Sequence, residues 1–383
     1  MSKSLTLTKS NHTKSPKRIL IFNWRDTKHF WAGGAEVYIH EVAKQWVMEG
    51  KEVILFCGND GHNAKHDNID GVWIIRRGGH YTVYLWAFLY YFYSLGKWCE
   101  IIIESENGCP FFTQLYSNKP VFLLIYHVHQ EVFRKHLKFP LSHIAMGIEK
   151  YLMPLVYRGG HVVTISESTK QDLVNLGLSE VEDIEIVNPG VHLSGYNALP
   201  ETFNPMFVYV GRLKHYKNID IAIHAFAKVL KKYPMALFTI AGDGEERSNL
   251  QLLTEQLEVS DSIVFLGKID EYQKAILLAK AWVAIQPSSV EGWGITVIEA
   301  NAAGTPVIAA NVPGLRDSVK DNITVVLVEP KNIEKFAEAM MTLIEDEEKR
   351  RQLSKEARIW SKNFSWQSAA KALLTSIERR INI

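Results

Sequence analysis

The sequence predicts an α/β protein with two doubly wound parallel sheets in tandem, and three observations lead to this prediction. Short apolar runs rich in Val and Ile alternate with helical patterns along the chain, as expected for parallel sheets covered on both faces by helices. The alternation stops at a turn-rich stretch, 192–205, and then restarts. At 383 residues, the chain is also too long for one ordinary core.

Each half contains its expected strands as apolar runs separated by helical patterns or turns. In the first half these runs are 18–24, 52–58, 72–77, 101–107, 121–127, 162–166 and 184–191. In the second half they are 206–213, 236–244, 263–268, 282–288, 306–311 and 324–330. We therefore predict an N-terminal Rossmann-like domain over 18–195 and a C-terminal one over 196–361, with ligands bound at strand ends between them. A final helix over about 362–383, with Ser365 as its N-cap, is expected to join the first domain.

The composition is that of an ordinary globular protein, with 47% apolar and 22% charged residues. A net charge of +1 gives no overall field that favours nucleic acid, so no nucleic-acid partner is expected. Cys57, Cys99 and Cys109 lack metal-ligand spacing, which favours a reduced, cytoplasmic compartment. Residues 1–17 are polar and lack the apolar core of a secretory signal. They predict a disordered tail, and the alternative is a weak attraction of its lysines to anionic lipid head groups.

The segment 81–96 is uncharged and crowded with aromatic residues. It is too short for a membrane-spanning helix, and Lys97 and Glu100 follow closely. We expect a buried helix or one that lies at an interface. The alternative, suggested by its Tyr and Trp content, is a peripheral contact of the N-terminal domain with a membrane or an apolar acceptor.

The stretch VEGWGITVIEANAAGTPVIA, 290–309, has the features of a phosphate site. Gly292 and Gly294 flank Trp293 just after an expected strand, and small residues allow a ligand to approach backbone N–H groups. The helix expected from near Ile295 points its positive end at the same place.

Two carboxylates, Glu291 and Glu299, bracket this phosphate site. Carboxylates do not bind an anion, but they accept hydrogen bonds from hydroxyl groups. The implied ligand has a diphosphate in the middle and hydroxyl-rich groups at both ends, which is the shape of a nucleotide sugar.

This stretch resembles the E-x7-E segment of the retaining glycosyltransferase family 4 (glycosyl transferases group 1), whose members have the GT-B fold of two Rossmann-like domains. The resemblance covers residue 18 to the C-terminus, because further motifs agree with the family in order and spacing. These are WAGGAE (31–36), YHVH (126–129), VTISES (163–168), VNPGV (187–191), GRLKHYKN (211–218), IAGDGEE (240–246) and FLGKI (265–269).

The resemblance implies a nucleotide-sugar site on the C-terminal domain. Arg212 and Lys217 would neutralise charge on the diphosphate leaving group. Glu291 would accept hydrogen bonds from hydroxyls of the donor sugar, and Glu299 from the ribose. The backbone of Lys268 and Ile269 would contact the base. The other implied donor-binding positions are Gly33, Gly34, Gly211, Gly292, Trp293, Gly294, Ile295 and Thr296.

The histidine segment departs from the family's usual His-Asp pair, since it is Tyr126-His127-Val128-His129. Alternation along a strand makes it unfavourable for both histidines to face the sugar at once. We favour His127 as the catalytic histidine, together with Arg212, Lys217 and Glu291, and His129 is the alternative.

Plainer interpretations exist for the same residues. Arg212 and Lys217 are also compatible with solvated charges at a strand end, Gly33-Gly34 with a simple turn, and Glu299 with a surface helix position. No Asp-x-Asp motif follows a strand, so we expect no metal and no cofactor beyond the donor substrate.

The function that follows is a retaining, metal-independent transfer of a hexose from a UDP- or GDP-sugar to an acceptor hydroxyl. The expected partners are the nucleotide sugar and a sugar or lipid-linked acceptor on the N-terminal domain, in glycan or glycolipid biosynthesis. The expected location is cytoplasmic, with the inner membrane face as a peripheral site. The alternative function is a non-catalytic nucleotide-sugar-binding or scaffold protein with the same fold. A nicotinamide-dependent oxidoreductase is disfavoured because no G-x-G-x-x-G follows a strand.

Overall fold

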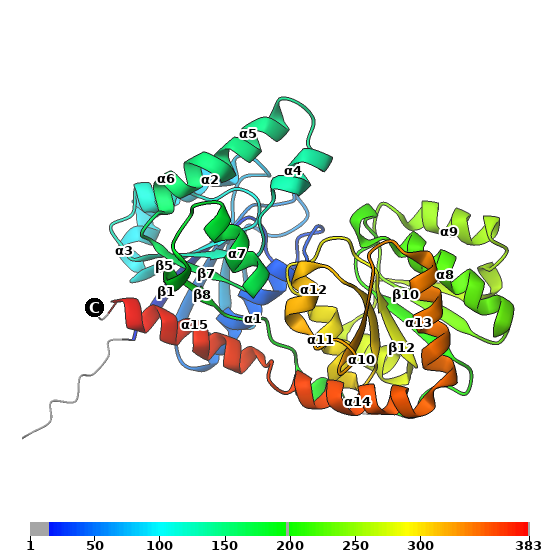
Figure 1. Ribbon diagram of the computed structural model, residues 1–383. Coiled ribbons are helices and arrows are strands. Elements are labelled where there is room, and N and C mark those ends of the chain that lie inside the picture. The colour runs from blue at the N-terminus through cyan, green and yellow to red at the C-terminus, as the bar shows by residue number, and fades with distance from the viewer. Residues whose placement is uncertain (1–14, 197–198, 382–383) are drawn as a thin grey trace, which may run out of the picture.

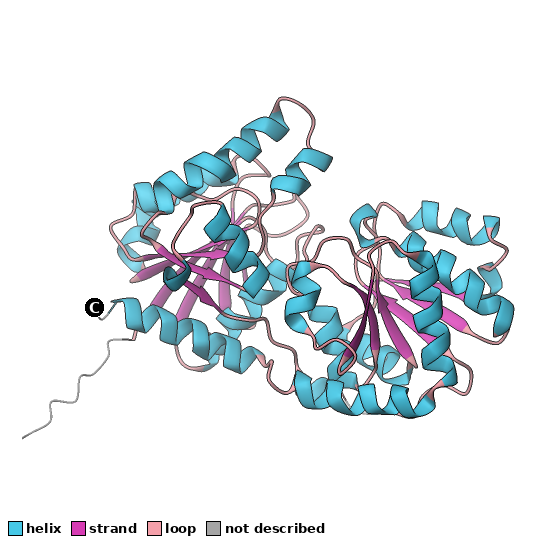
Figure 2. Ribbon diagram, viewed as in Figure 1, coloured by secondary structure: helices cyan, strands magenta, loops and turns pink. Residues whose placement is uncertain are grey.

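The computed structural model describes residues 15–196 and 199–381, which form two α/β domains (Figures 1 and 2). Of the tail predicted over 1–17, residues 1–14 lie outside the described part of the chain. Lys17 already donates its backbone N–H to Glu100 Oε2 at 2.8 Å, so the described chain is anchored before its first strand.

The N-terminal domain is built on an eight-stranded sheet with the order β3-β4-β2-β1-β5-β6-β7-β8. Every neighbouring pair is parallel except β3 and β4. The strands are β1 (Arg18–Asn23), β2 (Glu52–Cys57), β3 (His66–Ile69), β4 (Val72–Arg76), β5 (Ile101–Glu106), β6 (Val121–Ile125), β7 (His161–Thr164) and β8 (Ile184–Ile186). The sequence did not predict β3, because this short edge strand, HDNI, lacks an apolar run.

The alternation of side chains along β1 shows why both faces of this sheet are covered. Ile19 and Ile21 belong to one core with α1, whereas Leu20 and Phe22 belong to another with α2. In Figure 1, α2, α5 and α6 lie on one side of the sheet, and α1 and α15 on the other. The helices of this domain are α1 (Gly34–Met48), α2 (Val83–Tyr90), α3 (Gly96–Trp98), α4 (Gln130–His136), α5 (Leu141–Gly147), α6 (Met153–Tyr157) and α7 (Glu167–Asn175).

The aromatic segment 81–96 is helical but only partly buried. α2 continues through a π-helical turn, Tyr91–Leu95, into α3. Val83, Ala87 and Leu95 pack into the core, while Leu85, Trp86 and Phe92 are exposed. Among the described residues, no helix combines the length and the apolar character needed to cross a membrane.

The C-terminal domain has an all-parallel, six-stranded sheet with the order β11-β10-β9-β12-β13-β14. Its strands are β9 (Met206–Val210), β10 (Leu237–Ala241), β11 (Ile263–Gly267), β12 (Val283–Gln286), β13 (Val307–Ala310) and β14 (Val325–Val328). Its helices are α8 (Ile219–Lys232), α9 (Arg247–Gln256), α10 (Glu271–Lys280), α11 (Ile295–Ala303), α12 (Pro313–Ser318), α13 (Ile333–Glu345) and α14 (Glu347–Ser361). The strand order reverses between β9 and β12, and such a switch point is where open α/β sheets bind ligands.

The chain returns to the first domain through α15 (Trp366–Ile381), which lies against α1 in Figure 1. Trp46 Nε1 donates to the backbone oxygen of Ala370 at 3.0 Å, which ties the two helices together. Ser365 Oγ caps α15 by accepting from the backbone N–H of Ser368 at 3.0 Å. α14, in contrast, stays with the second domain, where Ser354 Oγ donates to the backbone oxygen of Gly304.

Candidate functional site

The candidate site begins at the switch point of the second sheet. Gly211 and Arg212 directly follow β9, and Glu291 lies in the loop after its neighbour β12. Parallel strands bring their carboxyl ends to the same edge of a sheet. Residues that are about 80 positions apart in the sequence therefore meet at one edge.

Lys217 and Glu291 form an ion pair at this edge, with side chains 11% and 14% exposed. The same carboxylate oxygen, Oε1, accepts from Gln286 Nε2 at 2.7 Å and from Ser288 Oγ at 3.0 Å. Three donors thus fix the orientation of one carboxylate before any ligand binds.

Arg212 is exposed and extends from the second domain to the glycine loop of the first. Its Nη2 contacts the hydroxyl of Tyr216 at 3.1 Å, and its Nη1 approaches the backbone oxygen of Trp31 at 3.5 Å. A Cβ atom on Gly33 would lie 3.0 Å from Arg212 Cζ. The absence of a side chain at Gly33 is therefore what allows the guanidinium to approach this loop. Among the described residues, no acidic side chain is paired with Arg212.

The N-termini of two helices meet where the domains face each other. A Cβ atom on Gly34, at the start of α1, would lie 3.6 Å from Ile295 Cδ1, at the start of α11. Gly294 caps α11 with φ of 87°, a conformation that favours glycine, and Thr296 follows in the first turn. Because first-turn amides have no partner within their helix, both ends present N–H donors.

The backbone N–H of Gly33, one of the expected donor-binding positions, already has a partner within the protein. It donates to Glu36 Oε2 at 2.7 Å in a capping interaction. The donors left for a ligand at this end are the amides that follow Gly33 in the first turn of α1.

The loop between the two glutamates also contacts the first domain. A Cβ atom on Gly292 would lie 2.9 Å from the backbone oxygen of Tyr126, so this position requires glycine for a close approach. The ring of Trp293 is 4% exposed and packs edge-on against Phe364, with ring centroids 5.5 Å apart. The side chain of Trp293 therefore packs inside the protein and does not line an open surface.

Glu299 is separate from the Lys217–Glu291 pair. It is 8% exposed, and its Oε1 binds Lys274 Nζ at 2.6 Å. Burial raises the pKa of Glu299, and the charge of Lys274 partly opposes this shift. Its Oε2 is buried and makes no hydrogen bond of good geometry among the described residues, although the Tyr196 hydroxyl interacts with this carboxylate and also acts to lower its pKa. A buried acceptor of this kind calls for a donor.

Two of the expected donor-binding residues lie farther along the sheet. Lys268 is exposed and Ile269 is half-buried, and both follow β11, the edge strand beyond β10 and β9. Parallel strands place them on the same edge of the sheet as Gly211, at the end distant from β12.

The histidine segment differs from the expectation based on strand alternation. β6 ends at Ile125, so His127 and His129 lie in the loop after it, and their ring centroids are 3.9 Å apart. Alternation does not apply to a loop, and the two rings contact each other with their planes inclined by 38° instead of pointing to opposite faces. His129 Nδ1 lies 3.5 Å from Glu149 Oε1 and 3.9 Å from Glu106 Oε1.

The electrostatic surroundings distinguish the two histidines. Burial lowers the pKa of His127 well below its usual value, and the positive charges of His129, Arg212 and Lys217 act in the same direction. Burial also disfavours charge on His129, but Glu106 and Glu149 outweigh this effect and raise the pKa of His129. His127 is thus a neutral ring on the side of Arg212 and Lys217.

Several buried charged residues near the site were not among the sequence-based candidates. Arg25 pairs with Glu36 at 2.9 Å, and Asn107 Nδ2 donates to the same carboxylate at 3.0 Å. Glu106 ends β5, and burial raises the pKa of its carboxyl to about 7. The sequence feature that could have identified Arg25 and Glu106 is their position at the ends of apolar runs.

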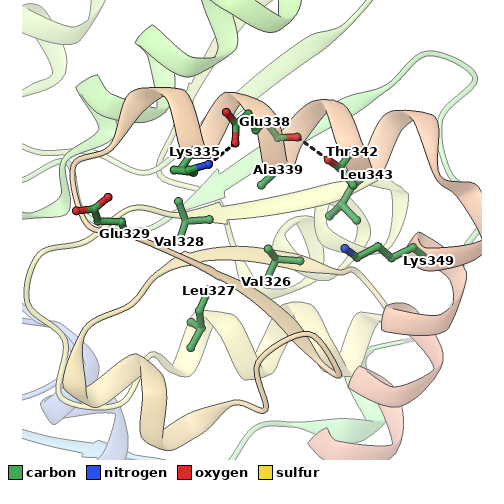
Figure 3. Close-up of a pocket in the computed structure, with 10 residues that line it drawn as sticks. All are labelled: Val326, Leu327, Val328, Glu329, Lys335, Glu338, Ala339, Thr342, Leu343 and Lys349. Carbon is green, nitrogen blue, oxygen red and sulfur yellow. Dashed lines mark hydrogen bonds and ion pairs between the residues drawn. The ribbon is translucent and has the colours of Figure 1, made fainter.

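A pocket of about 320 Å³ lies elsewhere, between β14 and α13 of the second domain (Figure 3). Its floor is apolar, with Val326 and Val328, and an ion pair of Lys335 and Glu338 at 2.8 Å lies on α13 beside it. None of its lining residues belongs to the candidate site. Within residues 15–196 and 199–381, no group of three or more His, Cys, Asp or Glu side chains could hold a metal ion.

Two Rossmann-like domains with a basic, glycine-lined site between their strand ends define the GT-B class of α/β proteins. A sucrose-phosphate synthase from Thermosynechococcus elongatus has this fold, with a TM-score of 0.81 at 20% identity, over 95% of this chain and 99% of its own. Anabaena HepE, solved in complex with UDP and glucose, has a TM-score of 0.77 at 17% identity, over 95% of this chain and 100% of its own. The predicted GT-B fold is therefore confirmed.

The chain belongs to the GT4 glycosyltransferases. The family models that match it are Glycosyltransferase Family 4, over residues 32–194, and Glycosyl transferases group 1, over residues 198–360.

Curated relatives match part of the chain and part of their own length. A glycogen synthase of Mycobacterium tuberculosis is 28% identical over 236 residues, which are 61% of this chain and 56% of the relative. A D-inositol 3-phosphate glycosyltransferase of Nocardia farcinica is 30% identical over 232 residues, which are 56% of this chain and 51% of the relative. An uncharacterized glycosyltransferase of Methanocaldococcus jannaschii is 29% identical over 231 residues, 56% of this chain and 59% of its own. The chain thus spans between half and three-fifths of these relatives.

Proposed function

We propose that the protein is a retaining glycosyltransferase that transfers a hexose from a UDP- or GDP-sugar to an acceptor hydroxyl. The observation that carries this proposal is the convergence of Arg212, Lys217 and the N-termini of α1 and α11 at one place. Two cationic side chains and two helix ends together suit a diphosphate. A neighbouring structure, HepE, is described in complex with UDP-glucose, which supports a nucleotide sugar as the donor.

The donor would lie along the edge of the second sheet. Arg212 and Lys217 would hold the diphosphate and stabilise the charge that develops when it leaves. Glu299 Oε2 would accept from a ribose hydroxyl, and the base would lie beside Lys268 and Ile269. Glu291, oriented by Lys217, would accept from hydroxyls of the transferring sugar.

Retention requires the acceptor to attack the face from which the diphosphate departs. In this proposal no protein carboxylate acts as a nucleophile, because Glu291 is held by Lys217, Gln286 and Ser288. Neutral His127 would bind a hydroxyl of the sugar next to the bond that breaks, and domain closure would exclude water. The cationic side chains and helix ends would serve in place of a metal ion.

The acceptor would bind to the first domain, and contact with a membrane surface is part of this proposal. Exposed apolar side chains gather on two helical stretches of this domain, and they include Leu85, Phe92, Ile144 and Leu155. Such side chains suit the boundary of a bilayer, where a lipid-linked acceptor would be located. Leu155→Glu should reduce co-sedimentation with phosphatidylglycerol vesicles, and unchanged co-sedimentation would refute the contact. The unpaired cysteines are compatible with a cytoplasmic location.

The test of the donor is a thermal-shift panel with UDP-, GDP-, ADP- and dTDP-sugars. A ligand that binds only the folded state raises the melting temperature, by an amount that grows with its concentration over Kd. We expect one nucleotide series to stabilise the wild type and to lose its effect in Arg212→Ala. If no nucleotide sugar shifts the melting temperature, the proposal fails. A non-catalytic binding protein would show the shift but no release of nucleoside diphosphate with any acceptor.

A further inference from the structure

Three loops of the first domain form an aromatic cluster beside the candidate site, because two of them carry its rings and the third, through Asp60, holds one of these in place. The loops follow β1, β2 and β4, which are parallel neighbours in the sheet, so their carboxyl ends meet at one edge. We define the aromatic platform as the side chains of Trp24, Phe30, Trp31 and His80. No role in donor binding accounts for these rings.

The rings of the aromatic platform contact one another and face solvent. The ring centroids of Trp24 and His80 lie 4.4 Å apart, those of Phe30 and Trp31 4.4 Å, and those of Trp31 and His80 6.1 Å. Phe30 is nonetheless 53% exposed and Trp31 is 43% exposed. Clustered exposed aromatic rings at the mouth of a site usually mark a binding surface.

Hydrogen bonds between the loops hold the platform in place. Trp24 Nε1 donates to the backbone oxygen of His80 at 3.2 Å. The backbone N–H of Phe30 donates to Asp60 Oδ2 at 3.1 Å. Within the loop after β1, the backbone N–H of Trp31 donates to His29 Nδ1 at 3.1 Å. A platform fixed in this way loses little conformational freedom when it binds a ligand.

The platform adjoins the place where the diphosphate would lie. Arg212 Nη1 approaches the backbone oxygen of Trp31 at 3.5 Å, and Gly33 is two residues farther along the same loop. A ligand on these rings would therefore be next to the donor, on the side of the first domain.

The surroundings of the platform favour a neutral, hydroxyl-bearing ligand. Lys28 binds Asp67 at 2.9 Å and Arg25 binds Glu36 at 2.9 Å, and Arg25 also lies over the Trp24 ring at 4.3 Å. Among the described residues around the platform, the charges without an ionic partner are Asp60, which accepts the backbone N–H of Phe30, and Arg212 on the donor side. Burial lowers the pKa of both His29 and His80, with the charge of Arg25 adding to the effect at both. These rings are therefore uncharged at neutral pH.

A pyranose ring matches these surfaces. One face of such a ring presents C–H groups with small positive charges, which suit the negative face of an aromatic ring, while its hydroxyls point outward to polar groups. We propose that the aromatic platform is an acceptor subsite for a neutral pyranose, so that the acceptor is a saccharide whose attacking hydroxyl is presented beside the donor. This inference rests on the proposed function and specifies its acceptor class.

The test is saturation-transfer NMR on the full chain with methyl pyranosides of gluco, galacto, manno and N-acetylgluco configuration. We expect saturation of ring C–H protons in the wild type, and a Kd about five- to tenfold weaker in Phe30→Ala and in Trp31→Ala. Trp31→Phe should recover most of the affinity. Trp73→Ala is the matched control, because Trp73 is 59% exposed in the same domain but lies on β4 outside the platform.

Further measurements separate the possible outcomes. If no pyranoside receives saturation, or if the platform variants bind as the wild type does, the acceptor subsite is refuted. Loss of binding to phosphatidylglycerol vesicles in Trp31→Ala, without pyranoside binding, would assign the rings to a lipid surface instead. Calorimetric titration of UDP and GDP tests the donor site independently. Pyranoside binding without binding of either nucleotide would contradict the proposed function but leave the saccharide subsite intact.

Discussion

The two domains differ in the charge that they expose at the edges where they face each other. The edge of the second domain presents cationic side chains, with Arg212 exposed and Lys217 paired to Glu291. The edge of the first domain presents aromatic rings, and its titratable residues Glu106 and His129 are buried.

This difference indicates a division of labour between the domains. An anion is attracted to the second edge, because cations and helix N-termini are available there without being fully neutralised. The first edge offers neutral rings and a neutral histidine, His127, which suit hydroxyls and C–H faces. The same fold thus provides one edge for a charged donor and one for an uncharged acceptor.

The largest expected effect comes from removing the exposed cation. Arg212→Ala should weaken the binding of UDP or GDP and lower turnover, each by the equivalent of about 2–4 kcal/mol. This is the free energy that one charged hydrogen-bond donor contributes to a buried anion. Calorimetric titration and steady-state rates measure both quantities. Lys214→Ala is the control, because Lys214 pairs with Glu245 at 2.7 Å and such exposed pairs contribute little. Near-native turnover in Arg212→Ala would show that the edge of the second domain does not bind the diphosphate through this cation.

The two glutamates test whether the donor lies along the second edge as proposed. Glu299→Gln should weaken the nucleoside diphosphate and the intact donor alike, by about 1.5–3 kcal/mol, because a charge-assisted bond to the ribose is weakened. Glu291→Gln should bind the nucleoside diphosphate as the wild type does, but its turnover should fall by the equivalent of a similar free energy. Glu271→Gln is the control, because its exposed side chain also contacts Lys274. The opposite pattern in the titrations would reverse the proposed direction of the donor.

The buried charges of the first edge predict a pH dependence of stability. The folded-state pKa of Glu106 is raised to about 7, above its unfolded value, so its stabilising contribution is present at low pH and is lost as pH rises through 7. The raised pKa of His129 acts with the same sign. As pH rises from 5 to 7, the free energy of unfolding of Glu106→Gln should therefore increase relative to that of the wild type, by about 1 kcal/mol per pH unit.

Urea unfolding of both proteins at pH 5, 6, 7 and 8 measures this difference. Glu131→Gln, a substitution at an exposed position of α4, serves as the control. A difference that stays constant with pH would show that Glu106 is not held in its protonated form.

The smallest expected effect is that of metal removal. Transfer activity should be unchanged by excess EDTA, because Arg212, Lys217 and the two helix ends supply the positive charge at the diphosphate in our proposal. Loss of activity with EDTA, followed by recovery with magnesium or manganese, would mean that the second edge is incomplete without a cation.

Local patterns in the sequence were enough to predict the fold and most of the positions at the second edge. Strand-helix alternation depends on neighbouring residues, so two parallel sheets could be predicted from it, and the GT-B class followed from the resemblance of the ordered motifs to the family. The glycines at 33, 292 and 294 were recognisable for a similar reason, since each stands in a loop that follows an apolar run. The edge strand β3 was missed because its four residues carry no apolar pattern.

The sequence by itself determined which residues lie at the strand ends, and only the tertiary structure decided how they pair. Lys217 and Glu291 are 74 residues apart, and Lys274 and Glu299 are 25 apart, and no local pattern assigns one lysine to one glutamate. The distinction between His127 and His129 likewise depends on Glu106 and Glu149, which come from other elements. Charge pairing and burial depend on distances in space. The strand order of the sheets sets those distances, and it cannot be predicted from any single segment of the sequence.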